Sequence, residues 1–528
     1  MKDLKNRVGF IVGEVDTTKF TFVSDRNKYP PRHEYLIIPE VKERRGNHFK
    51  NVDVLAQVTR LVNYSEIVSQ QLSLREVELL ISKYPADPKV YGEAKILGYL
   101  SENGDVQLPR SAAVPGQELF IAPSSLLENF FSENPDNCIE IGRLITRSDV
   151  PVRINPNGFR RHVAIIAQTG AGKSYLVGLI LEKLLPMGAT VVVFDPNSDY
   201  VRMKLDRNGN KTNVADFVTI YRPPGVKGRR FSDEEIGGVE SYTINFSSLE
   251  LEDVFGLCGI PRKWTRIRTA IENALNNLHG FYQPKDLYSG LETMAQNNDS
   301  DAERALPYVR RIMNFDIWGA KGIPLKNLLR PRRLSVIDLA GVQKDIMQYI
   351  VERTLSEAWS RATAGELDYP LFLVMEEAHN YAPKKNKSRA GYIVKRIASE
   401  GRKFKVFFLL VSQRPGRVDD DVLSQCNSQI IMRMANPVDM SAVRNAAEAL
   451  SQDLFEDLPG LNKGEAIIVG ELIKTPAMVK VTGRTSAEGG SDIDIIEALK
   501  RSRKAAEILD NTSTNIEEIR GSETVSEW

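Results

Sequence analysis

The sequence has few cysteines, little net charge and no long apolar run, and each of these absences narrows the class of protein. Its three cysteines, Cys138, Cys258 and Cys426, lie far apart without metal-like spacing, which indicates a reducing compartment and no disulfide framework. No apolar run approaches the roughly 18 residues of a membrane span, and the N-terminus turns polar too soon for a secretory signal. A net charge of +1 means that nucleic-acid binding would depend on local basic patches. We expect a cytoplasmic protein without a membrane segment.

The remaining composition is that of a globular chain with several domains. Its 528 residues are enough for about three or four domains with a large core. Of these residues 42% are hydrophobic and 26% are charged, as is typical of globular proteins. Residues 1–150 hold short β-branched and aromatic runs separated by turn residues, and one helical pattern at 65–84. Many short strands without alternating helices predict a small β-barrel, with a β-sandwich as the alternative. Residues 245–330 carry successive helical patterns and predict a helical insertion.

A turn of small residues organises the rest of the chain. The stretch Ala167-Gln168-Thr169-Gly170-Ala171-Gly172-Lys173-Ser174 follows an apolar run and precedes an amphipathic one, the strand–turn–helix order of a phosphate-binding P-loop. Backbone N–H groups of such a turn surround an anion, and the next helix directs its positive N-terminus toward it. Lys173 is placed to reach the β- and γ-phosphates, and Ser174 to ligate Mg²⁺. The candidate nucleotide-binding residues of this stretch are Gln168, Thr169, Gly170, Ala171, Gly172, Lys173, Ser174 and Tyr175.

Apolar strands alternate with helices on both sides of the predicted insertion, so we expect a largely parallel sheet. One such strand, 189–194, ends at Asp195. Ligands gather at the carboxyl ends of parallel strands, which makes Asp195 a candidate nucleotide contact, and a turn or cap role is equally open. The predicted α/β fold has these parts: an N-terminal β-barrel at 1–150, a RecA-like core at 151–244 and 331–485, the helical insertion at 245–330, and a C-terminal helix at about 492–509 within a tail at 486–528.

Two acidic residues end the next apolar strand, 371–375, in the arrangement known as Walker B. Hydrolysis of a metal-bound phosphate needs a carboxylate near the metal and a base for water. We assign Glu376 to the Mg²⁺ shell and Glu377 to the water. Gln413 follows another apolar strand, 406–411, and is a candidate γ-phosphate sensor because an amide both donates and accepts. No Asn-Lys-x-Asp guanine motif occurs, so ATP is favoured over GTP.

Several longer stretches resemble the HerA helicases of the HerA–FtsK superfamily over nearly the whole chain. They are IIAQTGAGKSYL, VVVFDPNSDY, LFLVMEEAHNYAP, ASEGRKF and LLVSQRPGRVDDDVLSQCNSQIIMRM. The resemblance implies an ATP-driven homo-hexameric ring that moves on double-stranded DNA. It also implies partnership with a NurA-type nuclease in DNA end resection for double-strand break repair, and ATP sites between subunits.

The resemblance also implies a cation from the neighbouring subunit at each ATP site. Arg402, in Glu400-Gly401-Arg402-Lys403-Phe404, matches the stretch of the family that carries this arginine. Arg161 is a second family-matched arginine near nucleotide, and the sequence does not separate it from Arg160. A solvated arginine that pairs with a surface carboxylate is the alternative for Arg402 and for Arg161.

Two basic loops follow the strands that end at Glu376 and Gln413. Such loops could line the pore of a ring and contact DNA phosphates, which is binding without sequence preference. A solvated surface is the alternative for each residue. The candidate DNA-binding residues are Lys384, Lys385, Lys387, Arg389 and Arg417.

Two other functions stay open from the sequence. One is a superfamily ATPase that moves protein or conjugative DNA, although relatives of that kind often carry membrane helices. The other is a nucleotide-gated scaffold that recruits a nuclease, which the set Glu376, Glu377 and Gln413 disfavours. The direction of translocation, hexamer versus heptamer, and strand separation versus movement along duplex are not determined by the sequence.

Overall fold

The computed structural model describes residues 6–45, 48–65, 68–83, 89–132, 137–226, 229–385, 388–490, 495–496 and 499–504. The chain forms two compact units, Met1–Glu488 and Gly489–Trp528. In the second unit, residues 495–496 and 499–504 are helical, and the rest of the helix predicted at 492–509 lies outside the described residues. Among the described residues, no helix combines the length and apolarity that crossing a membrane requires.

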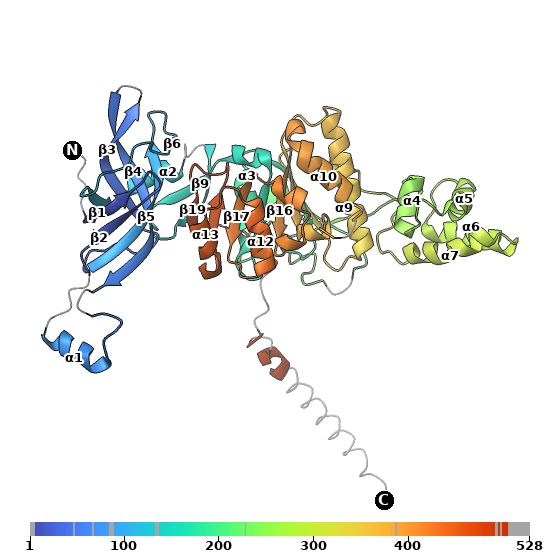
Figure 1. The fold of residues 1–528 in the computed structure, drawn as a ribbon. Coiled ribbons are helices and arrows are strands. Elements are labelled where there is room, and N and C mark those ends of the chain that lie inside the picture. The colour runs from blue at the N-terminus through green and yellow to red at the C-terminus, as the bar shows by residue number, and fades with distance from the viewer. Residues whose placement is uncertain are drawn as a thin grey trace, which may run out of the picture. The chain divides into compact units, whose positions relative to one another are not determined.

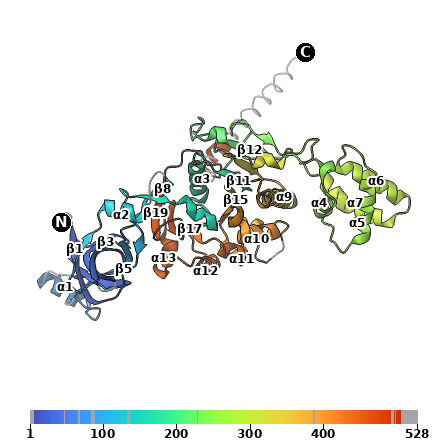
Figure 2. The ribbon, with the colours of Figure 1, turned by 90° about the horizontal axis from the view of Figure 1, so that it is seen from above.

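The N-terminal part is a closed antiparallel barrel, as predicted. Its strands are β1 (Arg7–Val15), β2 (Lys19–Ser24), β3 (Tyr35–Arg45), β4 (His48–Tyr64), β5 (Lys89–Leu100) and β7 (Glu118–Ile121), with a short β6 (Val106–Gln107) beside β5. The order β2-β1-β7-β3-β4-β5 closes because β5 also pairs with β2, from Lys19 opposite Lys95 to Ser24 opposite Val90. Figure 2 shows these strands as a ring. Closure leaves no open sheet edge, and alternate side chains fill the interior.

The helix predicted at 65–84 is shorter in the structure. It is α1, Leu74–Lys83, and it begins after Ser73, whose hydroxyl and backbone N–H both contact the carboxylate of Glu76. This reciprocal contact satisfies N–H groups that a helix start leaves unpaired, and it sets the first turn at 74.

The central sheet has twelve strands among the described residues, in the order β13-β12-β14-β11-β15-β16-β10-β17-β18-β19-β8-β9. The strands are β8 (Ile139–Leu144), β9 (Pro151–Ile154), β10 (Val163–Ile166), β11 (Thr190–Asp195), β12 (Val218–Arg222), β13 (Glu240–Ser241), β14 (Leu334–Asp338), β15 (Leu371–Glu376), β16 (Val406–Ser412), β17 (Ser428–Met432), β18 (Glu465–Val469) and β19 (Ala477–Val481). The strands from β13 to β17 pair in parallel, and those from β17 to β9 pair antiparallel. The largely parallel sheet predicted from the sequence therefore continues into an antiparallel edge.

Helices cover both faces of this sheet, which explains why its central strands are apolar throughout. In β15, Leu371 and Leu373 pack in one core with α9 (Lys344–Thr363) and α10 (Gly391–Glu400). Phe372 and Val374 face the other core, which contains α3 (Lys173–Leu184). Figure 1 shows α9 and α10 beside the sheet. This three-layer α/β arrangement with the barrel and the insertion confirms the predicted fold class.

The predicted division at residue 150 falls between β8 and β9, which pair with each other in the central sheet. Before them, α2 (Ser124–Phe131) connects barrel and sheet, since the ring of its Phe131 lies 5.2 Å from that of Tyr35 in the barrel. Arg32 of the barrel also pairs with Asp457 of the core at 2.7 Å. Barrel and core thus share buried contacts.

The insertion is a group of short helices that Figure 1 shows together. Its apolar positions, among them Ile271, Leu287 and Val309, are buried against one another. The helices are α4 (Leu251–Cys258), α5 (Thr265–Asn276), α6 (Pro284–Gln296), α7 (Ser300–Met313) and α8 (Leu325–Leu328). The remaining helices of the core are α11 (Asp420–Ser424), α12 (Pro437–Ala446) and α13 (Gln452–Asp457).

Candidate functional site

The predicted P-loop joins the carboxyl end of β10 to the first turn of α3. Gly170 and Gly172 have positive φ angles of 77° and 107°, which side-chain-bearing residues rarely adopt. Nothing would touch a Cβ on Gly170, so the backbone angle alone requires glycine there. Gly172 caps α3 in the left-handed conformation. The turn thus lies at the N-terminus of a helix, a position that fits the phosphates of a nucleotide.

Lys173 lies between the two Walker B carboxylates. Its Nζ is ion-paired with Glu376 and lies 3.2 Å from Oε1 of Glu377. Burial lowers the pKa of Lys173, but the charges of Glu376 and Glu377 outweigh it and the pKa is raised. Burial has the opposite effect on the carboxyl of Glu376. It raises the pKa of Glu376, and the charge of Lys173 offsets this rise in part. We conclude that Lys173 is cationic, while its single charge is shared between two carboxylates.

Asp199, which the sequence reasoning missed, faces Ser174 across the site. The Ser174 hydroxyl donates to Oδ2 of Asp199 at 2.9 Å. Next to it, the buried Tyr200 hydroxyl donates to Oε2 of Glu376 at 2.6 Å. Hydroxyl and carboxylate oxygens are the ligands that Mg²⁺ prefers. The donor set at Ser174, with Glu376 and Asp199 around it, therefore fits Mg²⁺. The signal in the sequence was the second acidic residue of DPNSDY.

This contact gives the first prediction. Asp199→Asn should raise the Mg²⁺ concentration needed for half-maximal nucleotide binding by about tenfold, because partners of metal ligands typically contribute 10–100-fold to affinity. Titration of Mg²⁺ with a fluorescent ATP analogue measures it, with the exposed Asp216→Asn as control. An unchanged titration would show that Asp199 does not orient Ser174.

Glu377, Gln413 and Thr169 form a short chain of contacts beside Lys173. Gln413 donates its backbone N–H to Oε2 of Glu377 at 3.4 Å, and its side-chain oxygen accepts from the Thr169 hydroxyl at 2.6 Å. Glu377 holds φ 52° and ψ 55°, a conformation that is costly outside glycine and common at functional sites. His379 lies with Nδ1 3.3 Å from Glu377 Oε2, and burial lowers the pKa of His379. The predicted base and sensor thus meet at the P-loop.

Asp195 supports the turn that follows β11. Its two carboxylate oxygens accept backbone N–H groups of Asn197, Asp199 and Tyr200 at 3.2, 3.0 and 2.9 Å. Its side chain is fully buried. Asp195 therefore has the turn role that the sequence left open, because a buried carboxylate is satisfied by the N–H groups beside it. Its contact with nucleotide stays a prediction.

Two other P-loop residues have partners within the core. The Gln168 N–H donates to the Arg433 carbonyl at 3.0 Å, beside the end of β17. The Tyr175 hydroxyl accepts the backbone N–H of Arg484 at 3.1 Å. These bonds fix the ends of the turn, and the exposed Thr169 and Gly170 lie between them.

Arg402, predicted to act on a neighbouring ATP site, and Arg160 and Arg161, of which one was predicted to lie near nucleotide, precede strands of the central sheet. Arg160 and Arg161 precede β10 and pair with Glu471 at 3.3 and 3.1 Å. Arg402 is exposed in the 3₁₀ turn Gly401–Phe404 just before β16, and Gln413 follows β16. The 7 residues of β16 span roughly 23 Å. Arg402 is therefore too far away to reach the P-loop of its own chain.

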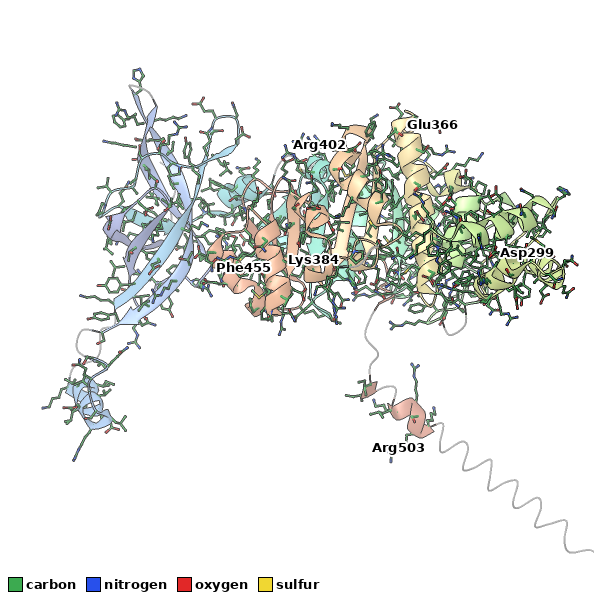
Figure 3. All side chains as sticks on the ribbon, turned by 45° about the vertical axis from the view of Figure 1, so that its right-hand side comes forward. Asp299, Glu366, Lys384, Arg402, Phe455 and Arg503 are labelled. Atoms are coloured by element: carbon green, nitrogen blue, oxygen red, sulfur yellow. The ribbon has the colours of Figure 1, made fainter. Side chains whose placement is uncertain are left out.

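The two predicted basic loops pair with each other at the carboxyl edge of the sheet. The Lys384 N–H donates to the Arg417 carbonyl at 2.8 Å, and Pro383 and Val418 form an antiparallel bridge. Lys384 also pairs with Asp420 at 2.8 Å, while Lys385 and Arg417 are exposed. Figure 3 shows Lys384 and Arg402 at separate places on the core. The predicted DNA contact Lys387 lies outside the described residues.

Arg389 differs from the other DNA-binding candidates because its side chain is engaged inside the protein. It pairs with Glu352 of α9, lies 3.6 Å from Asp253 of α4, and its guanidinium sits 4.8 Å from the centre of the Tyr349 ring. These partners tie the insertion to α9. The DNA contact predicted for Arg389 is not supported by this placement, since binding a phosphate would take the guanidinium away from Glu352, Asp253 and Tyr349.

Comparisons with known proteins show what this chain is similar to. Residues 139–358 match the family model described as the central domain of helicase HerA. The DNA double-strand break repair helicase HerA of Pyrococcus furiosus is 28% identical over 564 residues, covering 94% of this chain and 97% of that protein. A probable helicase of Methanocaldococcus jannaschii is 28% identical over 93% of each chain. The solved structure of VirB4 of Thermoanaerobacter pseudethanolicus matches 66% of this chain and 98% of its own, with 15% identity and a TM-score of 0.47.

Proposed function

Because this chain belongs to the HerA family of helicases, we propose that it is an ATP-driven motor that moves on and unwinds double-stranded DNA. The meeting of Lys173 with both Walker B carboxylates, and of Gln413 with Thr169, carries the proposal. A scaffold that only binds nucleotide would not need a carboxylate, an amide and an ammonium at one P-loop.

The residues divide the work of hydrolysis among them. Bound Mg²⁺–ATP supplies the phosphoryl group and the cation that polarises it. The N–H groups of Thr169, Gly170 and Gly172 would bind phosphate oxygens, since those of Gln168 and Ala171 donate to the carbonyls of Arg433 and Gln168. Ser174 and Glu376 would hold the metal. Lys173 exchanges a carboxylate partner for a phosphate oxygen. Glu377 accepts the proton of the attacking water, and the Gln413 amide holds that water in place.

The test is the ATPase rate of sized oligomers with and without duplex DNA. We expect turnover that rises when duplex is added, because a motor couples hydrolysis to its track. A hydrolysis rate that duplex leaves unchanged would contradict a DNA motor and favour a superfamily ATPase that moves another substrate.

A homo-hexameric ring with ATP sites between subunits is part of the proposal. Arg402 and Arg161 lie at the edge of the sheet opposite the P-loop, so a nucleotide that uses them must sit on a second copy of the chain. Arg402 is exposed, whereas Arg161 pairs with Glu471, and we therefore assign the trans role to Arg402. To contact a phosphate, Arg161 would have to break its ion pair with Glu471.

The paired loops 382–385 and 414–419 are the proposed DNA contacts. They present Lys385 and Arg417 at the edge where the P-loop lies, so movements at the γ-phosphate can pass through Gln413 into 414–419. Contacts of this kind are made to phosphates and carry no sequence preference.

Neutralising these loops gives a second prediction. Lys385→Gln with Arg417→Gln should weaken duplex binding equally for any sequence, and the log–log salt slope should flatten by about 0.9 for each phosphate that the protein no longer neutralises. Lys183→Gln, an exposed lysine near the end of α3, is the control. Unchanged affinity and slope would show that Lys385 and Arg417 are solvated surface residues that do not bind DNA.

The barrel is the proposed docking element for a NurA-type nuclease in end resection, in a cytoplasmic complex. The barrel should be tested by surface substitutions rather than by removal of residues 1–151. That removal would also delete β8, which lies between β19 and β9 in the central sheet. The edges of β19 and β9 that now pair with β8 would then be exposed. Co-purification of the nuclease with barrel-surface variants that remain hexameric is the measurement. Full retention by every such variant would place docking elsewhere.

A further inference from the structure

The segment after the last strand returns across the P-loop helix. We name residues 483–487 the strap. Arg484 of the strap is only 8% exposed. Its guanidinium donates from Nη1 to the Ser174 carbonyl at 2.6 Å. Nε donates to the Ser486 hydroxyl at 3.0 Å and Nη2 to the Ala487 carbonyl at 2.9 Å. One arginine therefore joins the strap to the first turn of α3.

The helix has room for this guanidinium because Gly178 has no side chain. A Cβ on Gly178 would lie 2.3 Å from Cζ and 2.4 Å from Nη1 of Arg484. Gly178 stands one turn after Ser174 on the same face of α3. A glycine in the interior of a helix usually destabilises the helix. Here the missing side chain of Gly178 leaves the space through which Arg484 reaches the Ser174 carbonyl.

A second set of bonds fixes the strap to α3. The Glu182 carboxylate accepts the N–H and hydroxyl of Thr485, both at 3.0 Å, and the N–H of Ser486 at 2.6 Å. On its other side, the strap pairs with the segment after Asp199 and Tyr200, where Ala487 donates its N–H to the Leu205 carbonyl at 2.8 Å. The strap is thus held in place independently of Arg484.

Ser174 is the point where this network meets the candidate metal site. Its carbonyl accepts from Arg484, and its hydroxyl donates to Asp199 at 2.9 Å. The next residue, Tyr175, accepts the backbone N–H of Arg484 through its own hydroxyl at 3.1 Å. Two consecutive residues of the first turn are therefore fixed by one residue that is 310 positions away from Ser174.

We propose that Arg484 is a positioning residue for the nucleotide site, which holds the first turn of α3 so that the Ser174 hydroxyl keeps its orientation toward Asp199 and the metal. The inference rests on the proposed Mg²⁺–nucleotide binding at the P-loop. A planar guanidinium with several donors can bind Ser174, Ser486 and Ala487 at once, whereas a lysine ammonium in the same place cannot match that geometry.

The test is the Mg²⁺ dependence of binding a fluorescent ATP analogue to the full-length protein. Arg484→Lys should raise the half-saturating Mg²⁺ concentration on the order of tenfold. Arg153→Lys is the matched control, since Arg153 is also largely buried and its ion pairs are with Glu128 of α2 and Glu140 of β8. It should leave the Mg²⁺ titration unchanged. Equal titrations for Arg484→Lys and the wild type would overturn the proposal.

A double-mutant cycle separates positioning from general destabilisation. If Arg484 acts through Ser174 and Asp199, the Mg²⁺ shifts of Arg484→Lys and Asp199→Asn should be less than multiplicative when combined. Fully multiplicative shifts would overturn the proposal. Should Arg484→Lys fail to fold, Gly178→Ala displaces the same guanidinium and should give the same Mg²⁺ shift, and an unshifted titration there would overturn the proposal as well.

Binding is measured here without DNA or turnover, so the two hypotheses fail separately. A wild-type protein that binds Mg²⁺–nucleotide but shows no duplex-dependent ATPase would contradict the motor function and leave the role of Arg484 testable. A wild-type protein that binds no nucleotide would refute both.

Discussion

A Glu377→Gln protein should bind ATP as the wild type does and hydrolyse it roughly 10²- to 10⁴-fold more slowly, the usual contribution of a general base. The amide keeps the shape of the side chain but cannot take a proton from water. The contact of Glu377 with Lys173 is the longer of the two carboxylate contacts, at 3.2 Å. Glu376 is fully buried and bonded to Tyr200 as well, so Glu376 carries the structural part of the pair.

The measurement is single-turnover hydrolysis beside equilibrium ATP binding and a thermal melt. Glu376→Gln is the contrasting variant, which should lose Mg²⁺-dependent binding and melting temperature together because it removes the closer partner of a buried ammonium. If Glu377→Gln retains turnover within tenfold of the wild type, Glu377 is not the base. Loss of ATP binding together with turnover would make it a structural residue.

Arg402→Ala should reduce turnover by about 10³-fold or more in the assembled ring, which is the usual effect of removing an arginine finger. Its exposure predicts that the fold and the ATP affinity of each subunit survive the change. Steady-state ATPase on sized rings measures it. Lys403→Ala, the exposed neighbour in the same 3₁₀ turn, is the matched control and should retain activity.

Mixed rings test whether Arg402 acts on the neighbour. Rings of Arg402→Ala and Glu377→Gln chains should regain activity at interfaces where an intact Arg402 meets an intact Glu377. Confirmed mixed rings without any regained activity would contradict a trans role. A Lys173→Ala chain is a poor partner for this mixture, because it removes the ammonium that two buried carboxylates share, at a cost of about 3–5 kcal/mol.

The sequence by itself determined the parts of the site that depend on neighbouring residues in the chain. The strand–turn–helix around Lys173 and the carboxylates after β15 follow from local apolar runs and from glycines at positive φ. These signals are short-range, so they were readable without a partner segment. The small barrel was likewise predicted from many short strands without alternating helices, whereas its closure depends on the pairing of β5 with β2. The resemblance to HerA helicases, carried by longer stretches, agrees with the family match.

Only the tertiary structure decided which of two similar residues faces the site. Asp195 ends β11 and Asp199 follows four residues later. Both are buried, and only their hydrogen bonds assign Asp195 to the turn and Asp199 to Ser174. Arg389 and Arg417 both lie in basic loops, yet of these two only Arg389 pairs with carboxylates of α4 and α9. Whether a charge is solvated or paired depends on segments far away in the chain, and composition does not encode that choice.

Strand neighbours and the strap were likewise decided in three dimensions. Nothing local in residues 139–154 distinguishes a barrel strand from a strand of the central sheet, and only the pairing of β8 with β19 assigns them. Arg484 stands in a polar stretch that resembles a linker, but Gly178 leaves space for it beside Ser174. Pairing and close packing depend on which surfaces meet, whereas the sequence pattern reports only how each segment alternates between apolar and polar residues.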